Sequence, residues 1–317
     1  MKRRLLLLLG LVAAAGCRPA DRGRELPPAR PPAPLPEGRA APAQAPPGTD
    51  VWIATLEGTG TNLALGEARN VTRRSGYDNQ PHFLPDGSAF LYTAIDEAGQ
   101  ADIWRHDLVT GSNTRVTRTS PESEYSATPL PDGSGFSAVR VEADSTQRLW
   151  RFSMDGGDAR VLLPDVAPVG YHAWGDAGTL LLFVLGTPAT LRVAELATGA
   201  ARVVATDVGR SLQPLPGRRA VSFVQRRGEG SAEVMLYDVG RDAITSLVEA
   251  VDGGDFHAWT PDGTLLMASG GRLLAWREGA AGWSELADLS PLGVTLSRLA
   301  VSPDGRRIAL VGEGPER

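Results

Sequence analysis

A repeated Pro-Asp-Gly turn constrains the fold of this 317-residue chain more than any other feature of its sequence. Four intact copies occur, at residues 85–87, 131–133, 261–263 and 303–305, and degenerate versions stand at Gly175–Gly178 and Leu215–Gly217. The intervals between successive turn glycines are 46, 45, 39, 46 and 42 residues, for Gly87, Gly133, Gly178, Gly217, Gly263 and Gly305. A period of about 44 residues is typical of a four-stranded antiparallel unit. The sequence therefore predicts an all-β fold built from six such units.

The residues of each unit support this prediction. Proline sets the φ angle of the turn, aspartate bonds back to the backbone, and glycine takes the left-handed conformation that closes a hairpin. Strand-like runs flank each turn, as in Pro81–Phe83 and Ala89–Thr93, and two further strands follow. Tryptophans recur in the third strands, where we expect them to pack between units: Trp52, Trp104, Trp150 and Trp276.

The two ends of the repeat region each hold half a unit. Residues 296–311 contain the first two strands of a unit, and residues 50–72 contain the last two. Joined, they complete a sixth blade and pair strand edges that would otherwise stay open. The prediction is a single six-bladed β-propeller over residues 50–317, its last blade closed by N- and C-terminal strands.

The residues before the propeller have the pattern of an export signal. A basic start, residues 1–4, precedes an apolar run from Leu5 to Gly16 that is too short to span a bilayer. The segment Ala13-Ala14-Ala15-Gly16-Cys17 resembles the lipobox of bacterial lipoproteins, although Ala14 stands where leucine is usual. We expect residues 1–16 to be a lipoprotein signal peptide and Cys17 to be lipidated. Ordinary cleavage after Ala15, leaving a free thiol, is the alternative.

Residues 17–49 follow as a lipid anchor and a spacer. Ten prolines and almost no large apolar side chains between residues 18 and 49 favour an extended tether rather than a folded domain. Arg18, rather than aspartate, follows the cysteine and favours the outer membrane. We expect an exported protein, lipid-anchored to the cell envelope at the periplasmic face of the outer membrane.

The repeat also has a family resemblance. Trp259-Thr-Pro-Asp-Gly263 and Ser302-Pro-Asp-Gly305 look like the WD-like repeats of the TolB propeller family, over residues 50–317. The resemblance implies the six-bladed fold but no single activity, because such propellers serve as docking modules, sugar-processing lyases and gates on serine peptidases. The sequence has no Gly-x-Ser-x-Gly nucleophile motif.

Composition excludes several chemistries from the propeller. Without Lys2, Arg3 and Arg4 of the leader, 29 basic residues face 37 acidic ones, a net charge of −8, so nucleic acid is not an expected partner. Lys2 is the only lysine and Cys17 the only cysteine, which leaves no lysine base, thiolate metal site or cysteine nucleophile. No cofactor is predicted. We expect a monomer that contacts the membrane through its lipid alone.

The connections into the first strands carry the candidate binding residues. They should gather on the face opposite the Pro-Asp-Gly turns, where aromatic groups beside carboxylates suit a saccharide or a peptide. The candidates are Tyr77, Asp78, Glu124, Tyr125, Tyr171, His172, Arg210, Asp255, Phe256 and His257.

Histidines near the channel offer an alternative. His172 and His257 share a repeated His-Ala-Trp sequence, and with His82 they could hold a divalent metal. The repeat could equally be one hydrogen-bonding arrangement used twice. The sequence favours a non-catalytic, envelope-anchored docking module for a protein or cell-wall component; the alternative is a metal-dependent lyase or hydrolase acting in the channel.

Overall fold

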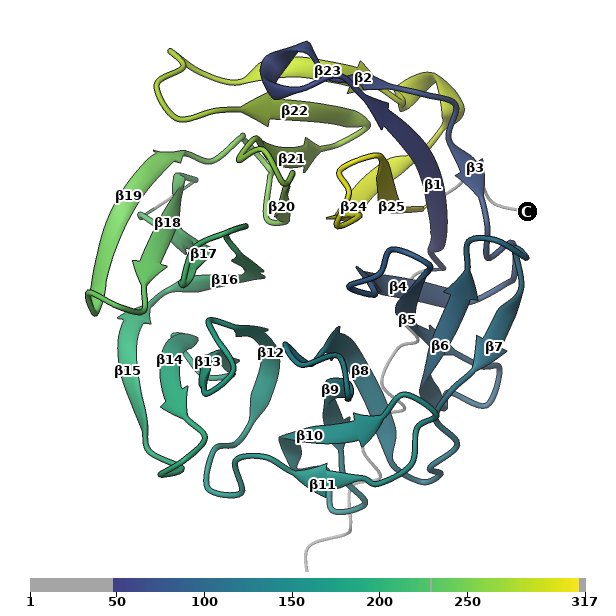
Figure 1. Ribbon diagram of the computed structural model, residues 1–317, viewed down its shortest axis with the longest axis vertical. Coiled ribbons are helices and arrows are strands. Elements are labelled where there is room, and N and C mark those ends of the chain that lie inside the picture. The colour runs from purple at the N-terminus through teal and green to yellow at the C-terminus, as the bar shows by residue number, and fades with distance from the viewer. Residues whose placement is uncertain (1–47, 229, 314–317) are drawn as a thin grey trace, which may run out of the picture. The chain divides into compact units, whose positions relative to one another are not determined.

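Six antiparallel sheets surround a central axis in the computed structural model, which describes residues 48–228 and 230–313 (Figure 1). In each sheet the first strand is innermost and the chain steps outward. The first blade is β4 (Tyr77–Phe83), β5 (Ala89–Ile95), β6 (Ala101–Asp107) and β7 (Asn113–Arg115); the second is β8 (Ser123–Pro129), β9 (Gly135–Val141), β10 (Gln147–Ser153) and β11 (Arg160–Val161).

The next three blades follow the same order. The third is β12 (Val169–Trp174), β13 (Thr179–Val184), β14 (Thr190–Glu195) and β15 (Ala201–Thr206). The fourth is β16 (Val208–Pro214), β17 (Ala220–Arg226), β18 (Ala232–Asp238) and β19 (Ala243–Glu249). The fifth is β20 (His257–Trp259), β21 (Leu265–Ser269), β22 (Arg272–Trp276) and β23 (Ser284–Asp288). The all-β, six-bladed prediction is confirmed.

The sixth blade joins the two ends of the propeller, as predicted. It contains β24 (Thr295–Val301), β25 (Arg307–Glu313) and β1 (Asp50–Glu57), with the short strands β2 (Ala64–Leu65) and β3 (Arg69–Asn70) outermost. Strand β1 pairs antiparallel with β25 from Asp50 opposite Gly312 to Thr55 opposite Arg307. Contacts begin before β1, because the Thr49 N–H donates to the Gly76 carbonyl at 3.0 Å and the Thr49 carbonyl accepts from Asp78 N–H at 2.9 Å.

The turns between first and second strands use the predicted chemistry. Five of the six turn glycines have φ between 68° and 82°, and Gly178 is the exception. In the four intact Pro-Asp-Gly turns the aspartate caps the backbone, as where Asp132 Oδ1 accepts from Ser134 N–H at 3.0 Å. Asp176 makes the same bond to Gly178 N–H at 2.9 Å, so the degenerate turn keeps the aspartate without the left-handed glycine. These aspartates have a structural role.

The core consists of six apolar clusters, one at each junction between neighbouring blades. Trp52, Trp104, Trp150 and Trp276 each pack into one of them, which confirms the prediction that they lie between blades. Because every cluster draws side chains from two blades, no blade buries its faces alone.

Among the described residues, no helix is long and apolar enough to span a membrane. The helical segments there are two single 3₁₀ turns, η1 (Gly60–Asn62) and η2 (Ser290–Leu292). The predicted signal peptide, Cys17 and the spacer up to residue 47 lie outside the described residues.

Candidate binding site at the channel mouth

The six innermost strands line a cavity of about 70 Å³ in the central channel. Most of its lining residues lie in the middle of these strands, farther from the Pro-Asp-Gly turns than a second pocket, and we call this part of the channel its mouth. Five of the six first strands, β4, β8, β12, β16 and β24, carry a β-bulge or other irregularity near the mouth. A bulge interrupts the ladder and redirects side chains, and bulges are common beside functional sites.

Arg298 spans the mouth of this channel. Its guanidinium carbon lies 4.0 Å from the ring centre of Phe256 and 4.9 Å from that of Tyr171, and its Nη2 donates to the Tyr171 hydroxyl at 2.8 Å. The three residues come from the sixth, fifth and third blades, and each stands seven positions before its turn glycine. The repeat therefore places them at equivalent points of the ring, where a guanidinium held by two aromatic faces gains cation–π stabilisation.

A second arginine lies beside Phe256. The guanidinium carbon of Arg210 is 5.7 Å from the Phe256 ring centre, and its Nε is 3.5 Å from Asp255 Oδ2. Asp255 also faces Arg226, at 3.7 Å, so one carboxylate is shared between two guanidiniums. Asp255 Oδ2 is buried and lacks a hydrogen-bond donor. The cations on this side of the channel are therefore not fully neutralised.

Tyr77 and Tyr125 lie near this group without lining the cavity. Burial raises the pKa of Tyr77 to about 12, while Arg298 opposes the rise and the neighbouring Tyr171 and Tyr125 add to it. Tyr77 therefore stays protonated at neutral pH and can donate a hydrogen bond. Of the residues predicted from sequence, the structure brings together Tyr77, Tyr125, Tyr171, Arg210 and Phe256, with Asp255 behind them.

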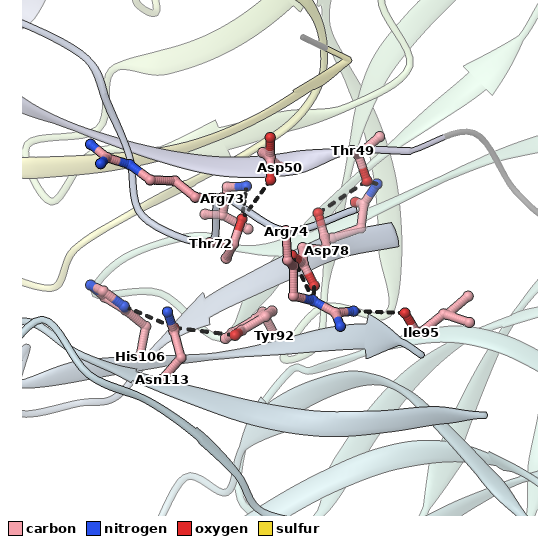
Figure 2. A network of polar contacts seen from close by, with 12 residues as sticks. Thr49, Asp50, Thr72, Arg73, Arg74, Asp78, Tyr92, Ile95, His106 and Asn113 are labelled. Carbon is pink, nitrogen blue, oxygen red and sulfur yellow. Dashed lines mark hydrogen bonds and ion pairs between the residues drawn. The ribbon is translucent and has the colours of Figure 1, made fainter. Parts of the chain in front are cut away.

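Asp78 and Glu124 have a different role from the one predicted, because both carboxylates are completely buried. Asp78 accepts from Arg74 Nε at 2.7 Å, and Arg74 also donates to the Ile95 carbonyl at 2.6 Å (Figure 2). Glu124 accepts from Arg140 Nε at 2.8 Å and from the Thr119 hydroxyl. Burial raises the pKa of Asp78 to about 6 despite the Arg74 ion pair. Neither side chain is free to contact a ligand.

His172 and His257 belong to matching hydrogen-bonded groups between blades. The Ser137 hydroxyl accepts from Trp174 Nε1 at 3.0 Å, lies 2.7 Å from His172 Nε2, and donates to the Thr128 carbonyl at 3.2 Å. Ser222 repeats this arrangement with Trp259 Nε1 at 2.8 Å, His257 Nε2 at 2.7 Å and the Gln213 carbonyl at 3.2 Å.

The serine fixes the tautomer of each histidine. A hydroxyl has one proton and two lone pairs, and the carbonyl takes the proton, so both ring nitrogens that face the serine must donate to it. Each histidine then carries its proton on Nε2, and its Nδ1, buried and without a partner, is the unprotonated nitrogen. Burial lowers the pKa of His172 and of His257 to about 3, so both are neutral. The repeated His-Ala-Trp is a shared hydrogen-bonding arrangement.

No arrangement of the described side chains supports the metal alternative. Burial lowers the pKa of His82 to about 4, and it lines the same cavity as His172 and His257. Nε2 of the other two is bonded to serine, which leaves their buried Nδ1 as the nitrogen that a metal could take. In residues 48–228 and 230–313, no group of three or more His, Cys, Asp or Glu side chains is placed to hold a metal ion.

Sequence reasoning missed several residues that line the cavity, among them Arg298, Gln80 and Ser126. Arg298 could have been found by aligning the blades on their turn glycines, since it falls in register with Tyr171 and Phe256. Gln80 and Ser126 stand in the same register, seven residues before Gly87 and Gly133, so the same alignment would have found them. They have φ of 60° and 55°, a left-handed conformation that is uncommon outside glycine. Gln80 Oε1 accepts from the Ser126 N–H at 2.7 Å, and the Ser126 hydroxyl is buried without a partner.

The six blades around a central channel form a β-propeller whose fold is TolB-like. A putative TolB from Agrobacterium tumefaciens matches with a TM-score of 0.68 and 15% identity, over 86% of this chain and all of that one. TolB from Acinetobacter baumannii matches with a TM-score of 0.53 and 15% identity, over 84% of this chain and 65% of that one. An oligogalacturonate lyase in complex with manganese matches with a TM-score of 0.55 and 15% identity, over 80% and 83%.

Sequence comparison adds a partial match. The chain is 28% identical over 123 residues to dipeptidyl-peptidase 5 of Porphyromonas gingivalis, which is 36% of this chain but 17% of that protein's length. No model of a known protein family matches the chain. The structural similarity establishes the TolB-like propeller fold, which unrelated functions share.

Proposed function

We propose that this protein is an envelope-anchored lipoprotein whose propeller docks a protein or a cell-wall component at the channel mouth without catalysing a reaction. One observation carries the proposal: Arg298, Tyr171 and Phe256 from three blades meet at the mouth, held on a rigid ring. Aromatic and arginine side chains are the residue types that dominate binding energy at interfaces. The TolB-like fold is compatible with such a role.

Capture from detergent-solubilised envelope by the immobilised propeller tests the docking proposal. Phe256→Ala and Tyr125→Ala should weaken capture, since truncating a central aromatic anchor costs about 1–3 kcal/mol of binding, roughly 5- to 150-fold. Ser88→Ala and Ser134→Ala, beside the opposite turns, are matched controls and should capture normally. Thermal melting of all four variants establishes that they are folded. Loss of capture in the serine variants alone would move the site to the other face.

Anchoring through Cys17 is the second part of the proposal. It rests on the basic start, the short apolar run and the lipobox-like residues before Cys17. The alternative is a metal-dependent lyase or hydrolase. The fold that this chain shares with the oligogalacturonate lyase supports it. No metal-binding arrangement among the described histidines adds to that support. The metal content of the purified protein separates the two functions.

A further inference from the structure

We propose that the channel mouth recognises a carboxylate carried by an extended peptide segment of the docked partner, and that Arg298 is the residue that pairs with it. The inference rests on the proposed docking function and names the chemistry of its ligand. The structural basis is a preorganised guanidinium at the mouth that forms no ion pair with any acidic residue among those described.

Most N–H donors of Arg298 form no hydrogen bond with the described residues. A guanidinium carries five N–H donors, and Arg298 gives one hydrogen bond, to the Tyr171 hydroxyl. Within the described ranges 48–228 and 230–313, no Asp or Glu forms an ion pair with it. Its plane is fixed by Phe256 and Tyr171, so little side-chain freedom remains to be lost on binding. The geometry suits the planar, two-oxygen acceptor of a carboxylate.

The local charge is positive although the chain is acidic overall. The charged side chains that line the cavity are Arg210 and Arg298, and no described Asp or Glu lines it. Asp78 and Glu124 are buried and paired, so they do not repel an incoming anion at short range. The chain's formal net charge is −5, and a cationic mouth in such a chain selects an anionic group.

The aromatic faces favour a peptide over a sugar. A saccharide stacks on an open aromatic face, but Arg298 covers faces of both Phe256 and Tyr171, and Arg210 also approaches Phe256. The cavity of about 70 Å³ can admit the tip of an acidic side chain. The buried Ser126 hydroxyl, without a partner, lines this cavity and offers a hydrogen bond to the ligand.

Nuclear magnetic resonance of the arginine Nε–Hε groups of the full chain tests the proposal. The probes are the peptide acetyl-Gly-Gly-Glu-Gly-Gly-amide, its Gln counterpart, and galacturonate. We expect the Glu peptide to shift the Arg298 signal in a saturable way and the Gln peptide to leave it in place. Raising the salt concentration should weaken binding of the Glu peptide, since screening reduces attraction between partly exposed charges.

Variants of one hairpin provide the control. Because variants at position 298 lack this arginine signal, isothermal titration calorimetry measures peptide binding to them and to the unmodified protein. Arg298→Gln should weaken binding of the Glu peptide at least tenfold, as expected when a charged hydrogen bond is lost. Arg298→Lys, which keeps the charge but not the planar fork, should weaken it less. Arg306→Gln, at the exposed turn of the same β24–β25 hairpin, should bind like the unmodified protein. Equal shifts with the Glu and Gln peptides, or full binding by Arg298→Gln, would overturn the proposal.

The outcomes separate this inference from the docking function. If Phe256→Ala abolishes envelope capture while Arg298→Gln and high salt leave it intact, docking stands and the carboxylate proposal is refuted. If galacturonate shifts the Arg298 signal and the Glu peptide does not, the peptide assignment is refuted. If the Glu peptide binds through Arg298 but the Phe256→Ala variant captures as much envelope material as the serine controls do, the carboxylate site is supported and the proposal of docking at the mouth is refuted.

Discussion

Replacing Ser222 by alanine removes the centre of the Trp–Ser–His group that joins the fourth and fifth blades. The Trp259 Nε1–H and the His257 Nε2–H both lose their acceptor, and both side chains remain buried. A buried donor without a partner costs about 1–3 kcal/mol, so we expect a loss of about 3 kcal/mol in the free energy of unfolding. That is a large fraction of the 5–15 kcal/mol typical of folded domains.

Calorimetry and urea unfolding measure this loss. For a domain of this size about 1 kcal/mol lowers Tm by roughly 2–4 °C, so Ser222→Ala should melt about 6–12 °C lower. Ser134→Ala, at an exposed turn, is the matched serine control and should shift Tm by about 2 °C or less. Adding Trp259→Phe to Ser222→Ala removes one unpaired donor, so the double variant should be more stable than the sum of the single effects predicts.

Two results would refute the reasoning. Normal melting of Ser222→Ala would mean that its hydroxyl does not satisfy Trp259 and His257. Strict additivity in the double variant would mean that Trp259 and Ser222 do not interact. The equivalent Ser137→Ala, between the second and third blades, should reproduce the effect because its contacts are the same.

Further predictions concern the anchor, the closure, pH and metal. Cys17→Ser should move the protein from the membrane to the soluble fraction and stop incorporation of labelled fatty acid. Deleting residues 296–317 should unfold or aggregate the propeller, whereas deleting 18–47, which keeps Thr49, should leave its melting unchanged. The pKa of His172 and His257 falls from about 6.5 unfolded to about 3 folded. Between about pH 6.5 and pH 3, the unfolded chain therefore binds more protons than the folded chain does. Urea titrations should show the free energy of unfolding declining by roughly 1 kcal/mol for each histidine per unit fall in pH. Asp78, whose pKa is raised to about 6, opposes this decline, whereas His82, whose pKa is lowered to about 4, adds to it. Elemental analysis should find no stoichiometric divalent metal; near-stoichiometric metal that His172→Ala with His257→Ala removes would support the enzyme alternative.

The repeat made the fold predictable because each blade needs the same local turn. Pro-Asp-Gly encodes its geometry within three residues, and the spacing between copies encodes the blade. Closure followed from counting strands at the two ends, and β1 pairs with β25 as that count requires. These inferences depend on chemistry that is local in the sequence.

The site was less predictable because it depends on which strand lies opposite which. Glu124 is neutralised by Arg140, which faces it across the β8–β9 ladder, and the sequence does not state that register. The serine partners of His172 and His257 stand 35 residues earlier, in the preceding blade. Such contacts between blades show whether a polar residue is a buried structural group or a ligand-binding group. In the sequence, the two kinds of residue look the same, because both stand in or near loops.

The pairing of β1 also has a mechanical consequence. If residues 17–47 tether the propeller to a membrane, tension on that tether reaches the ring at Thr49 and pulls along β1. The ladder bonds of an antiparallel pair lie across the strand direction, so the bonds that join residues 50–55 to β25 would be loaded together rather than opened one by one. Thr49 adds its bonds to Gly76 and Asp78 of the first blade. The strand that closes the ring would thus also bear the load, and pulling from residue 48 in a force spectrometer should require more force than peeling β25 away from the other end.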